Sequence, residues 1–185
     1  MKIEIIAGSP RMESVTKRVA LHLFDRIRET EDIEVGLINV QNHILPPVET
    51  VITSPNDAPR HLKHVAARMF EADAFILVSP EYNGGYSPAM KNLLDHFPKQ
   101  NHKVFGIVTA SPGAMGGIRA ALALQHLVYG LFGIGSPHML IVPEVDKKFT
   151  VDGALSDDRF SSQVAHFIRE FLWLVRNITS VPVES

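Results

Sequence analysis

The sequence contains no cysteine among its 185 residues. This absence excludes a disulfide framework, a zinc site with thiolate ligands, dithiol redox chemistry and a cysteine-based phosphatase mechanism. Basic clusters are also missing, and the 18 Lys and Arg against 20 Asp and Glu give a formal charge of −2. A nearly balanced charge argues against nucleic acid as the main partner.

Uninterrupted apolar runs of membrane-spanning length are missing as well. The nearest candidate, residues 118–134, is broken by Arg119, Gln125 and His126. Residues 1–8 are too short and too interrupted for a signal peptide, and their pattern indicates a first strand. We therefore expect a cytoplasmic protein without membrane contact. At this length the chain is predicted to form a single domain over residues 1–185 with a substantial core.

Short apolar runs alternate with helix-like segments along the chain. The strand candidates are residues 3–7, 34–39, 74–79, 104–110 and 138–142, and most are almost continuously apolar. Such runs are typical of a parallel sheet covered on both faces. The segments between them show helical periodicity, as in 16–27, 62–70, 89–97, 120–132 and 156–175. The alternation predicts an α/β fold with three layers, doubly wound around a five-stranded parallel sheet.

The order 2-1-3-4-5 is favoured for this sheet, because ligand-type loops follow strands one and three, where that order has its switch point. A long Pro-rich connection at residues 41–59 leaves two interpretations open. It either covers a ligand or meets a second subunit, or it is a meandering surface loop.

The first of three glycine-containing loops, residues 8–16, leaves strand one and enters a helix. Its amides and the positive end of the helix therefore point at one spot. Ser9, Ser14 and Thr16 add hydroxyl donors and Arg11 adds a charge, a set that suits a terminal phosphate. The loop has neither the Gly-x-Gly-x-x-Gly nor the Gly-Lys-Thr pattern, which disfavours a dinucleotide in a Rossmann pocket or ATP with magnesium. Alternatively, Ser14 only caps the helix.

The second loop, residues 80–88, offers the rigid ring of Tyr82 and small residues that let a ligand approach the backbone. The third, residues 110–117, has three glycines and amides able to bind a carbonyl or stabilise negative charge. Because the carboxyl ends of parallel strands meet at one edge, the three loops are predicted to form one site for a flat heteroaromatic ligand with a phosphate.

On these motifs the sequence resembles the NADPH-dependent FMN reductases of the flavodoxin-like superfamily, which include quinone, azo-dye and chromate reductases. The resemblance covers residues 1–142. It rests on Gly-Ser-Pro-Arg-x-x-Ser-x-Thr at 8–16, Pro-Glu-Tyr-Asn-Gly at 80–84 with Lys91-Asn92 behind it, and Ser-Pro-Gly-x-x-Gly-Gly at 111–117. It implies a flavodoxin-like fold, bound FMN, and NADPH or NADH as co-substrate.

The resemblance also implies roles for individual residues. The FMN phosphate would be held by Ser9, Arg11, Ser14 and Thr16. The isoalloxazine would be lined, chiefly through backbone groups, by Pro80, Glu81, Tyr82, Asn83 and Gly84. Its other side would be closed by Ser111, Gly113, Met115 and Gly116. Many relatives carry Asn where Thr16 stands, but Thr16 keeps a hydroxyl donor; Gly85 and Tyr86 depart from the family pattern and leave the substrate contacts open.

The activity implied is hydride transfer from NAD(P)H through FMN to a small acceptor, such as a flavin, quinone, azo dye or metal oxyanion, by ping-pong exchange. No residue is assigned as a catalytic acid or base, and Glu81 is expected to cap local amides. Two alternatives stand beside this activity: a flavodoxin-type one-electron carrier, and a regulatory protein that has lost flavin. Met115 and glycines in place of an aromatic favour the reductase over the carrier.

Relatives in the family form dimers or tetramers, so a homodimer or homotetramer is expected here. Residues 120–132 are apolar on more than one face, and a further stripe is formed by Met90, Leu93, Leu94 and Phe97. This apolar surplus suggests a subunit contact. Trp173 is predicted to serve in packing or an interface. His61 and His64 lack a third local ligand, so solvent-facing positions are favoured over a metal site.

Overall fold

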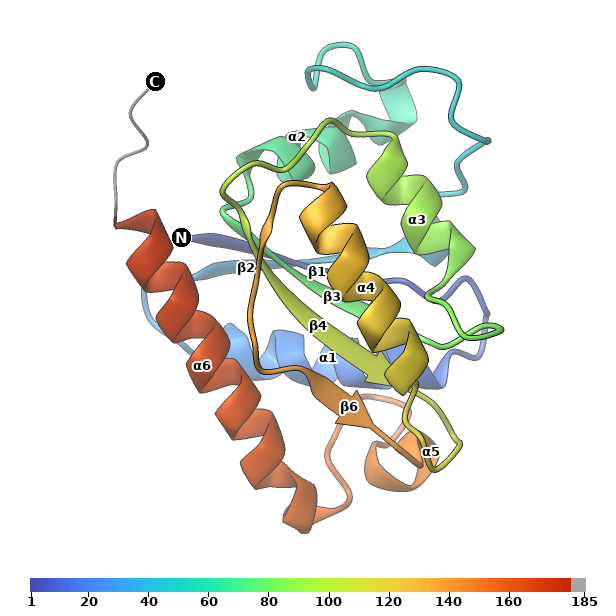
Figure 1. Cartoon of the computed structure of the whole chain (residues 1–185), viewed down its shortest axis with the longest axis vertical. Helices are drawn as coiled ribbons and strands as arrows, with labels where there is room; N and C mark the ends of the chain where they lie inside the picture. The colour runs from blue at the N-terminus through green and yellow to red at the C-terminus, as the bar shows by residue number, and fades with distance from the viewer. Residues whose placement is uncertain (181–185) are drawn as a thin grey trace.

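A parallel sheet runs through the centre of the computed structural model, which describes residues 1–180 (Figure 1). Four long strands, β1 (Lys2–Ala7), β2 (Glu34–Asn39), β3 (Ala74–Ser79) and β4 (Val104–Ala110), lie in the order β2-β1-β3-β4. Every residue of β3 and β4 is buried, which explains why their sequences are continuously apolar. The predicted order 2-1-3-4-5 and the flavodoxin-like fold class are thereby confirmed.

The fifth position of the sheet differs from the prediction, because two short strands share it. β5 (Ile134–Gly135) pairs with the start of β4, and β6 (Leu140–Val142) pairs with its end. Only β6 falls within the predicted strand at 138–142. Pro137 stands between the two strands and has no N–H to donate, which is consistent with the break. A two-residue strand shows no alternation, so the sequence pattern could not reveal β5.

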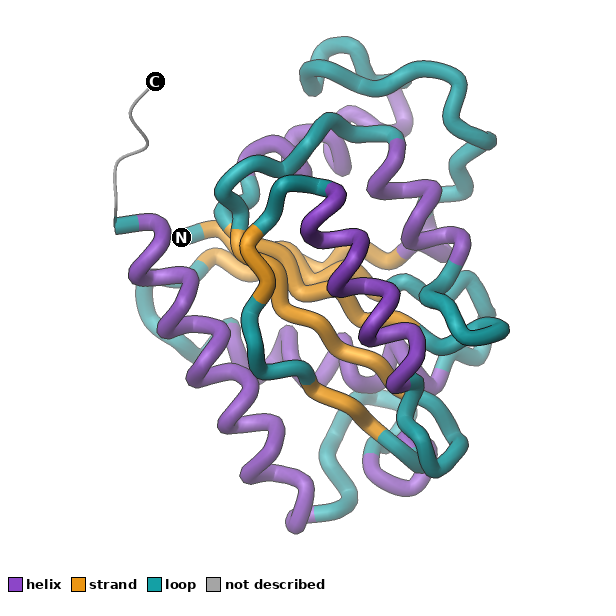
Figure 2. Tube along the Cα trace, in the orientation of Figure 1, coloured by secondary structure: helices purple, strands orange, loops and turns teal. Residues whose placement is uncertain are grey.

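Helices cover both faces of the sheet (Figures 1 and 2). One face packs against α1 (Val15–Ile27), α5 (Val145–Lys148) and α6 (Ser161–Thr179), and the other against α2 (Lys63–Glu71), α3 (Pro88–Asp95) and α4 (Ile118–Gly130). Single 3₁₀ turns occur at Val40–Asn42, Arg60–Leu62 and Asp158–Phe160. Among residues 1–180, no helix combines the length and the apolar character that a bilayer crossing requires.

The structure tests three predictions about exposed or interface residues. Met90, Leu93, Leu94 and Phe97 are all buried in the core on the α3 side of the sheet, so the idea that this stripe supplies surplus apolar surface is wrong. The stripe has helical spacing, but the sequence could not show that the sheet already covers it. Trp173 is 61% exposed, which excludes the packing role and leaves the interface role as a prediction. His61 and His64 are exposed, as predicted.

Candidate functional site

The loops after β1, β3 and β4 converge at the carboxyl edge of the sheet around a cavity of about 200 Å³. Eight of the predicted site residues line this cavity: Ser9, Arg11, Ser14, Thr16, Pro80, Glu81, Tyr82 and Ser111. The other five belong to the second and third loops but do not line the cavity: Asn83, Gly84, Gly113, Met115 and Gly116. Segments that are about a hundred positions apart in sequence therefore share one site.

Four lining residues were not predicted, namely Glu13, Val15, Ala110 and Pro112. Each belongs to the first or the third of the predicted loops, so position along the chain is the signal that points to them. Glu13 is the one with chemical consequence, because its exposed carboxylate lies at an edge where an anion is expected. Its charge would weaken phosphate binding unless the side chain turns towards solvent.

The first loop presents the start of α1 to the cavity. Ser14 is the N-cap of α1, and its Oγ accepts a hydrogen bond from Lys17 N at 3.2 Å. The capping alternative is therefore observed, although the hydroxyl proton stays free for a ligand. Thr16 is buried and its Oγ1 donates weakly to Ala110 O at 3.5 Å, so that it is held next to the third loop. The uncompensated amides of the first helical turn and the positive end of the helix favour an anion here.

The second loop is built around a tight turn at Asn83-Gly84. Tyr82 N donates to Gly85 O at 2.8 Å, and Gly85 N donates to Tyr82 O at 3.0 Å. Both central residues have positive φ, 51° at Asn83 and 81° at Gly84. This is a type I′ turn, for which Asn-Gly is the preferred sequence. The turn sets the Tyr82 ring beside the cavity, where the Arg11 guanidinium stacks on it at 4.7 Å from the ring centre.

Two serines close the base of the second loop. Ser79 Oγ donates to Pro80 O at 2.8 Å and accepts from Ser87 N at 3.0 Å. Ser87 is in turn the N-cap of α3, with its Oγ accepting from Ala89 N and Met90 N. These groups are buried or nearly buried, and each has a hydrogen-bond partner. The bonds therefore hold the loop at both ends. Its geometry is fixed before any ligand arrives.

The third loop reverses direction through two glycines in the left-handed region, Gly116 at φ 60° and Gly117 at φ 86°. The amides of Gly113 and Gly116 already have acceptors within the loop, Ser111 Oγ at 3.2 Å and Gly113 O at 3.2 Å. Within residues 1–180, the amides of Ala114, Met115 and Gly117 have no protein acceptor. These three are therefore the donors that the loop can offer to a bound carbonyl or anion.

Glu81 joins the second loop to the third. Its Oε2 accepts from Arg119 N at 3.0 Å and from Ala120 N at 3.3 Å, both at the start of α4. Its Oε1 lies 3.6 Å from Arg119 Nη1. A carboxylate at this end of a helix also interacts favourably with the helix dipole. Glu81 caps amides as predicted, but the prediction that these amides are local is wrong, because they begin a helix 38 positions away.

The role of Glu81 predicts a measurable loss of stability. Glu81→Ala removes the cap of α4 and is expected to lower the free energy of unfolding by about 1–2 kcal/mol in urea titrations. Glu81→Gln keeps an acceptor oxygen and should lose about half as much. Glu29→Ala, which removes only a surface contact to Arg26, is the matched control and should change stability by less than about 0.5 kcal/mol. Equal losses for Glu81→Ala and Glu29→Ala would contradict the capping role.

These features fit FMN. The cavity offers hydroxyls, a helix start and Arg11 to a phosphate. Beside it, a methyl group added at Gly84, Gly85 or Gly113 would come no closer than 3.5 Å to another described atom, so the backbone surface there is open to a flat ring. Tyr82 Oη is buried without a hydrogen-bond partner among the described residues, which leaves it available to a ligand.

Comparison with known proteins finds a matching family, a sequence relative and similar solved structures. A family model described as NADPH-dependent FMN reductase matches residues 1–146. An FMN-dependent NADPH-azoreductase from Staphylococcus aureus is 30% identical over 186 aligned positions, covering 96% of each chain. Among solved structures, the flavoenzyme FerB, an NAD(P)H:acceptor oxidoreductase from Paracoccus denitrificans, is similar with a TM-score of 0.80 at 20% identity, covering 95% of this chain and 97% of that one.

A flavodoxin from Pseudomonas aeruginosa, solved as a point mutant, is similar at a TM-score of 0.58 and 16% identity, covering 93% of this chain and 99% of that one. At such identities the two structural similarities concern the fold alone. The FMN-binding character of the site depends instead on the family match and the azoreductase relative.

Proposed function

The chain belongs to the NADPH-dependent FMN reductase family, and on this premise we propose that it reduces small planar acceptors with NADPH or NADH in a ping-pong cycle. The observation that carries the proposal is the convergence of the three loops on one cavity at the carboxyl edge of the sheet. FMN bound there would supply the chemistry of hydride transfer between the nicotinamide and the acceptor.

The residues of this chain would position the cofactor and tune its surroundings. Ser9, Arg11, Thr16 and the start of α1 would hold the phosphate. The unpaired amides at 114, 115 and 117 would stabilise negative charge that develops near them, because preorganised donors need no reorganisation during reaction. Glu81 binds the amides of Arg119 and Ala120, and it would thereby hold the third loop next to the Tyr82 turn.

The open surface beside the cavity indicates which kind of acceptor molecule the site admits. Met115 is 66% exposed, and the glycines at 84, 85 and 113 leave the neighbouring backbone uncovered. An uncovered site admits flat molecules of different outline, one after the other, which suits ping-pong exchange. Since a 30% identical relative is named an azoreductase, an azo dye or a quinone is the acceptor class to test first, in a protein we propose to be cytoplasmic.

The test of this function has two parts. Purified protein should bind FMN, and anaerobic NADPH should bleach the flavin absorbance without a protein partner; methyl red or menadione should then restore it. Arg11→Ala is expected to weaken FMN binding by about 10–100-fold, the loss of one charged hydrogen bond, whereas Arg26→Ala should not. Flavin that NADPH cannot bleach would refute the reductase and favour an electron carrier.

We further propose that the chain assembles as a homodimer or homotetramer through α4. Leu122 and Tyr129 lie seven positions apart on the outer face of α4 and are 52% and 71% exposed, and Phe132 just beyond is 63% exposed. Sedimentation equilibrium should show an oligomer that Leu122→Glu converts to monomer. Val151→Glu changes an apolar residue outside this helix that is 78% exposed, and it should leave the oligomer intact. A monomeric parent protein would contradict the proposal.

A further inference from the structure

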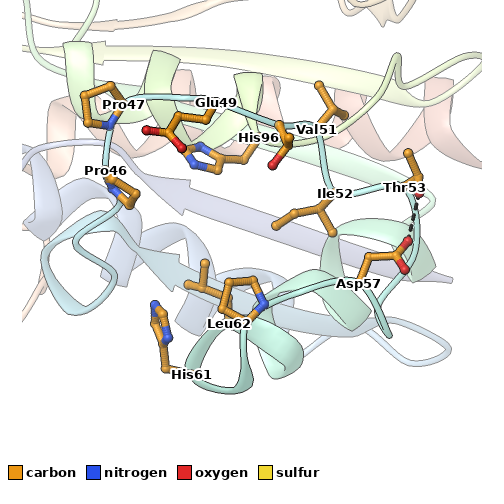
Figure 3. A pocket seen from close by; sticks show the side chains of 12 residues that line it. Pro46, Pro47, Glu49, Val51, Ile52, Thr53, Asp57, His61, Leu62 and His96 are labelled. Carbon is orange, nitrogen blue, oxygen red and sulfur yellow. Dashed lines mark hydrogen bonds between the residues drawn. The ribbon is translucent and has the colours of Figure 1, made fainter.

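A second and larger cavity, of about 500 Å³, lies under the Pro-rich connection between β2 and α2 (Figure 3). It shares no residue with the cavity at the sheet edge. The connection forms most of its wall, which the 3₁₀ turn just before α2 and the residue after α3 complete. The lining residues are Pro46, Pro47, Glu49, Thr50, Val51, Ile52, Thr53, Asp57, Pro59, His61, Leu62 and His96.

The wall of this cavity is held in place by hydrogen bonds to α3. Asn92 Nδ2 donates to Leu45 O at 3.1 Å and to Pro46 O at 2.9 Å, and Ile52 N donates to His96 O at 2.8 Å. Further along, Thr53 Oγ1 and Ser54 Oγ both donate to Asp57 Oδ2 at 2.8 Å. A loop fastened at both ends in this way presents a preformed cavity, which lowers the ordering cost of binding.

The polar groups of the wall are acceptors. His96 Nδ1 lies 2.7 Å from Asn92 O, and because a carbonyl oxygen can only accept, Nδ1 carries the proton. Nε2 is then an acceptor in the neutral ring, and within residues 1–180 it has no partner although the residue is only 7% exposed. Figure 3 shows the Glu49 carboxylate on the same side of the cavity as this ring.

Charge on the wall has one sign. Glu49 and Asp57 are its acidic residues, and no Lys or Arg of the described chain lines it. The hydrogen bond from Thr53, followed by that from Ser54, lowers the pKa of Asp57, which keeps its carboxylate ionised at neutral pH. Pro46, Pro47 and Ile52 supply apolar contact surface between the polar groups (Figure 3). Such a wall suits a molecule with an apolar body and a cationic head that donates hydrogen bonds.

We propose that this cavity is a binding site for a small organic cation, an amidine or ammonium group on an aromatic body, with Glu49, Asp57 and His96 Nε2 accepting its N–H groups. A volume of about 500 Å³ lies within the range of small-molecule sites. The aromatic body packs on the prolines and Ile52. The site is separate from the flavin site in sequence and in its lining, so the proposal stands without the proposed function.

Benzamidine and benzoate form a matched pair of probes, since they share a ring and differ in the charge of the head group. We expect benzamidine, titrated into FMN-loaded protein, to shift the methyl NMR signals of Val51, Ile52 and Leu62 saturably. Benzoate should bind at least about tenfold more weakly because its charge repels Glu49 and Asp57. Equal affinity for the two probes, or benzamidine shifts confined to other residues, would overturn the proposal.

Two variants locate the binding groups. Glu49→Gln keeps the shape of an exposed side chain that makes no hydrogen bond within residues 1–180, and it should weaken benzamidine binding about fivefold. Asn92→Ala leaves the lining intact but frees the loop, and it should weaken binding to a similar extent. Glu31→Gln is the control, at an exposed acid outside the wall. Unchanged affinity in Glu49→Gln would refute the site, while FMN absorbance and NADPH bleaching in the same sample report on the flavin function separately.

Discussion

Gly116→Ala is expected to abolish tight FMN binding, with the dissociation constant rising about 100-fold or more. Gly116 has φ of 60°, a conformation that costs a residue with a Cβ about 1–2 kcal/mol. The added methyl group would also lie 2.7 Å from Ile141 Cγ2, 2.8 Å from Pro143 N and 2.9 Å from Val142 C. Two of these atoms are backbone at the end of β6, so the third loop must move to relieve the contact. A loss of about 2.7 kcal/mol corresponds to the 100-fold change.

FMN fluorescence titration of the flavin-free protein measures this effect directly. Gly130→Ala is the matched control, because it adds the same methyl group at the other end of α4, where no described atom lies within 4 Å. It should leave the FMN dissociation constant unchanged and, because Ala is the better helix former, raise the melting temperature by no more than about 4 °C. Should Gly116→Ala bind FMN as tightly as Gly130→Ala, the third loop would not form part of the flavin site.

Local sequence patterns were sufficient for the features that depend on neighbouring residues. The continuous apolar runs of β3 and β4 follow from burial on both faces, and Asn83-Gly84 is the sequence that a type I′ turn prefers. The strand order followed from where the ligand-type loops stood, so even the topology was accessible without long-range information.

Features that depend on distant partners were not accessible. The capping role of Glu81 could be proposed, but its partner amides at 119 and 120 could not be identified from sequence. The stripe of Met90 and its neighbours has the same spacing whether a sheet or a second subunit covers it. The cavity beneath the Pro-rich connection depends on the hydrogen bonds from Asn92 to the carbonyl oxygens of Leu45 and Pro46. No local sequence pattern predicts these bonds.

The largely buried ion pair between Glu4 of β1 and Arg68 of α2 also joins residues far apart in sequence. Arg68→Met is expected to lower the free energy of unfolding by about 3–5 kcal/mol. Arg68 Nε donates to Glu4 Oε1 at 2.8 Å, and Nη2 donates to Oε2. Gly36 stands opposite Glu4 in the sheet, and a Cβ there would collide with both partners. Removing the guanidinium leaves a carboxylate that is 9% exposed without its partner, and that accounts for the large effect.

The double variant Glu4→Leu with Arg68→Met distinguishes the loss of an ion pair from the loss of packing. Replacing both charges by apolar groups removes the unpaired carboxylate, so the stability should return to within about 1 kcal/mol of the parent. Arg26→Met, which breaks a surface pair with Glu29, should change stability by less than about 0.5 kcal/mol. Urea unfolding at one fixed FMN concentration compares all variants, since FMN binding itself stabilises the fold. If Arg68→Met destabilises no more than Arg26→Met, the pair contributes nothing to the fold, and the glycine at position 36 needs another explanation.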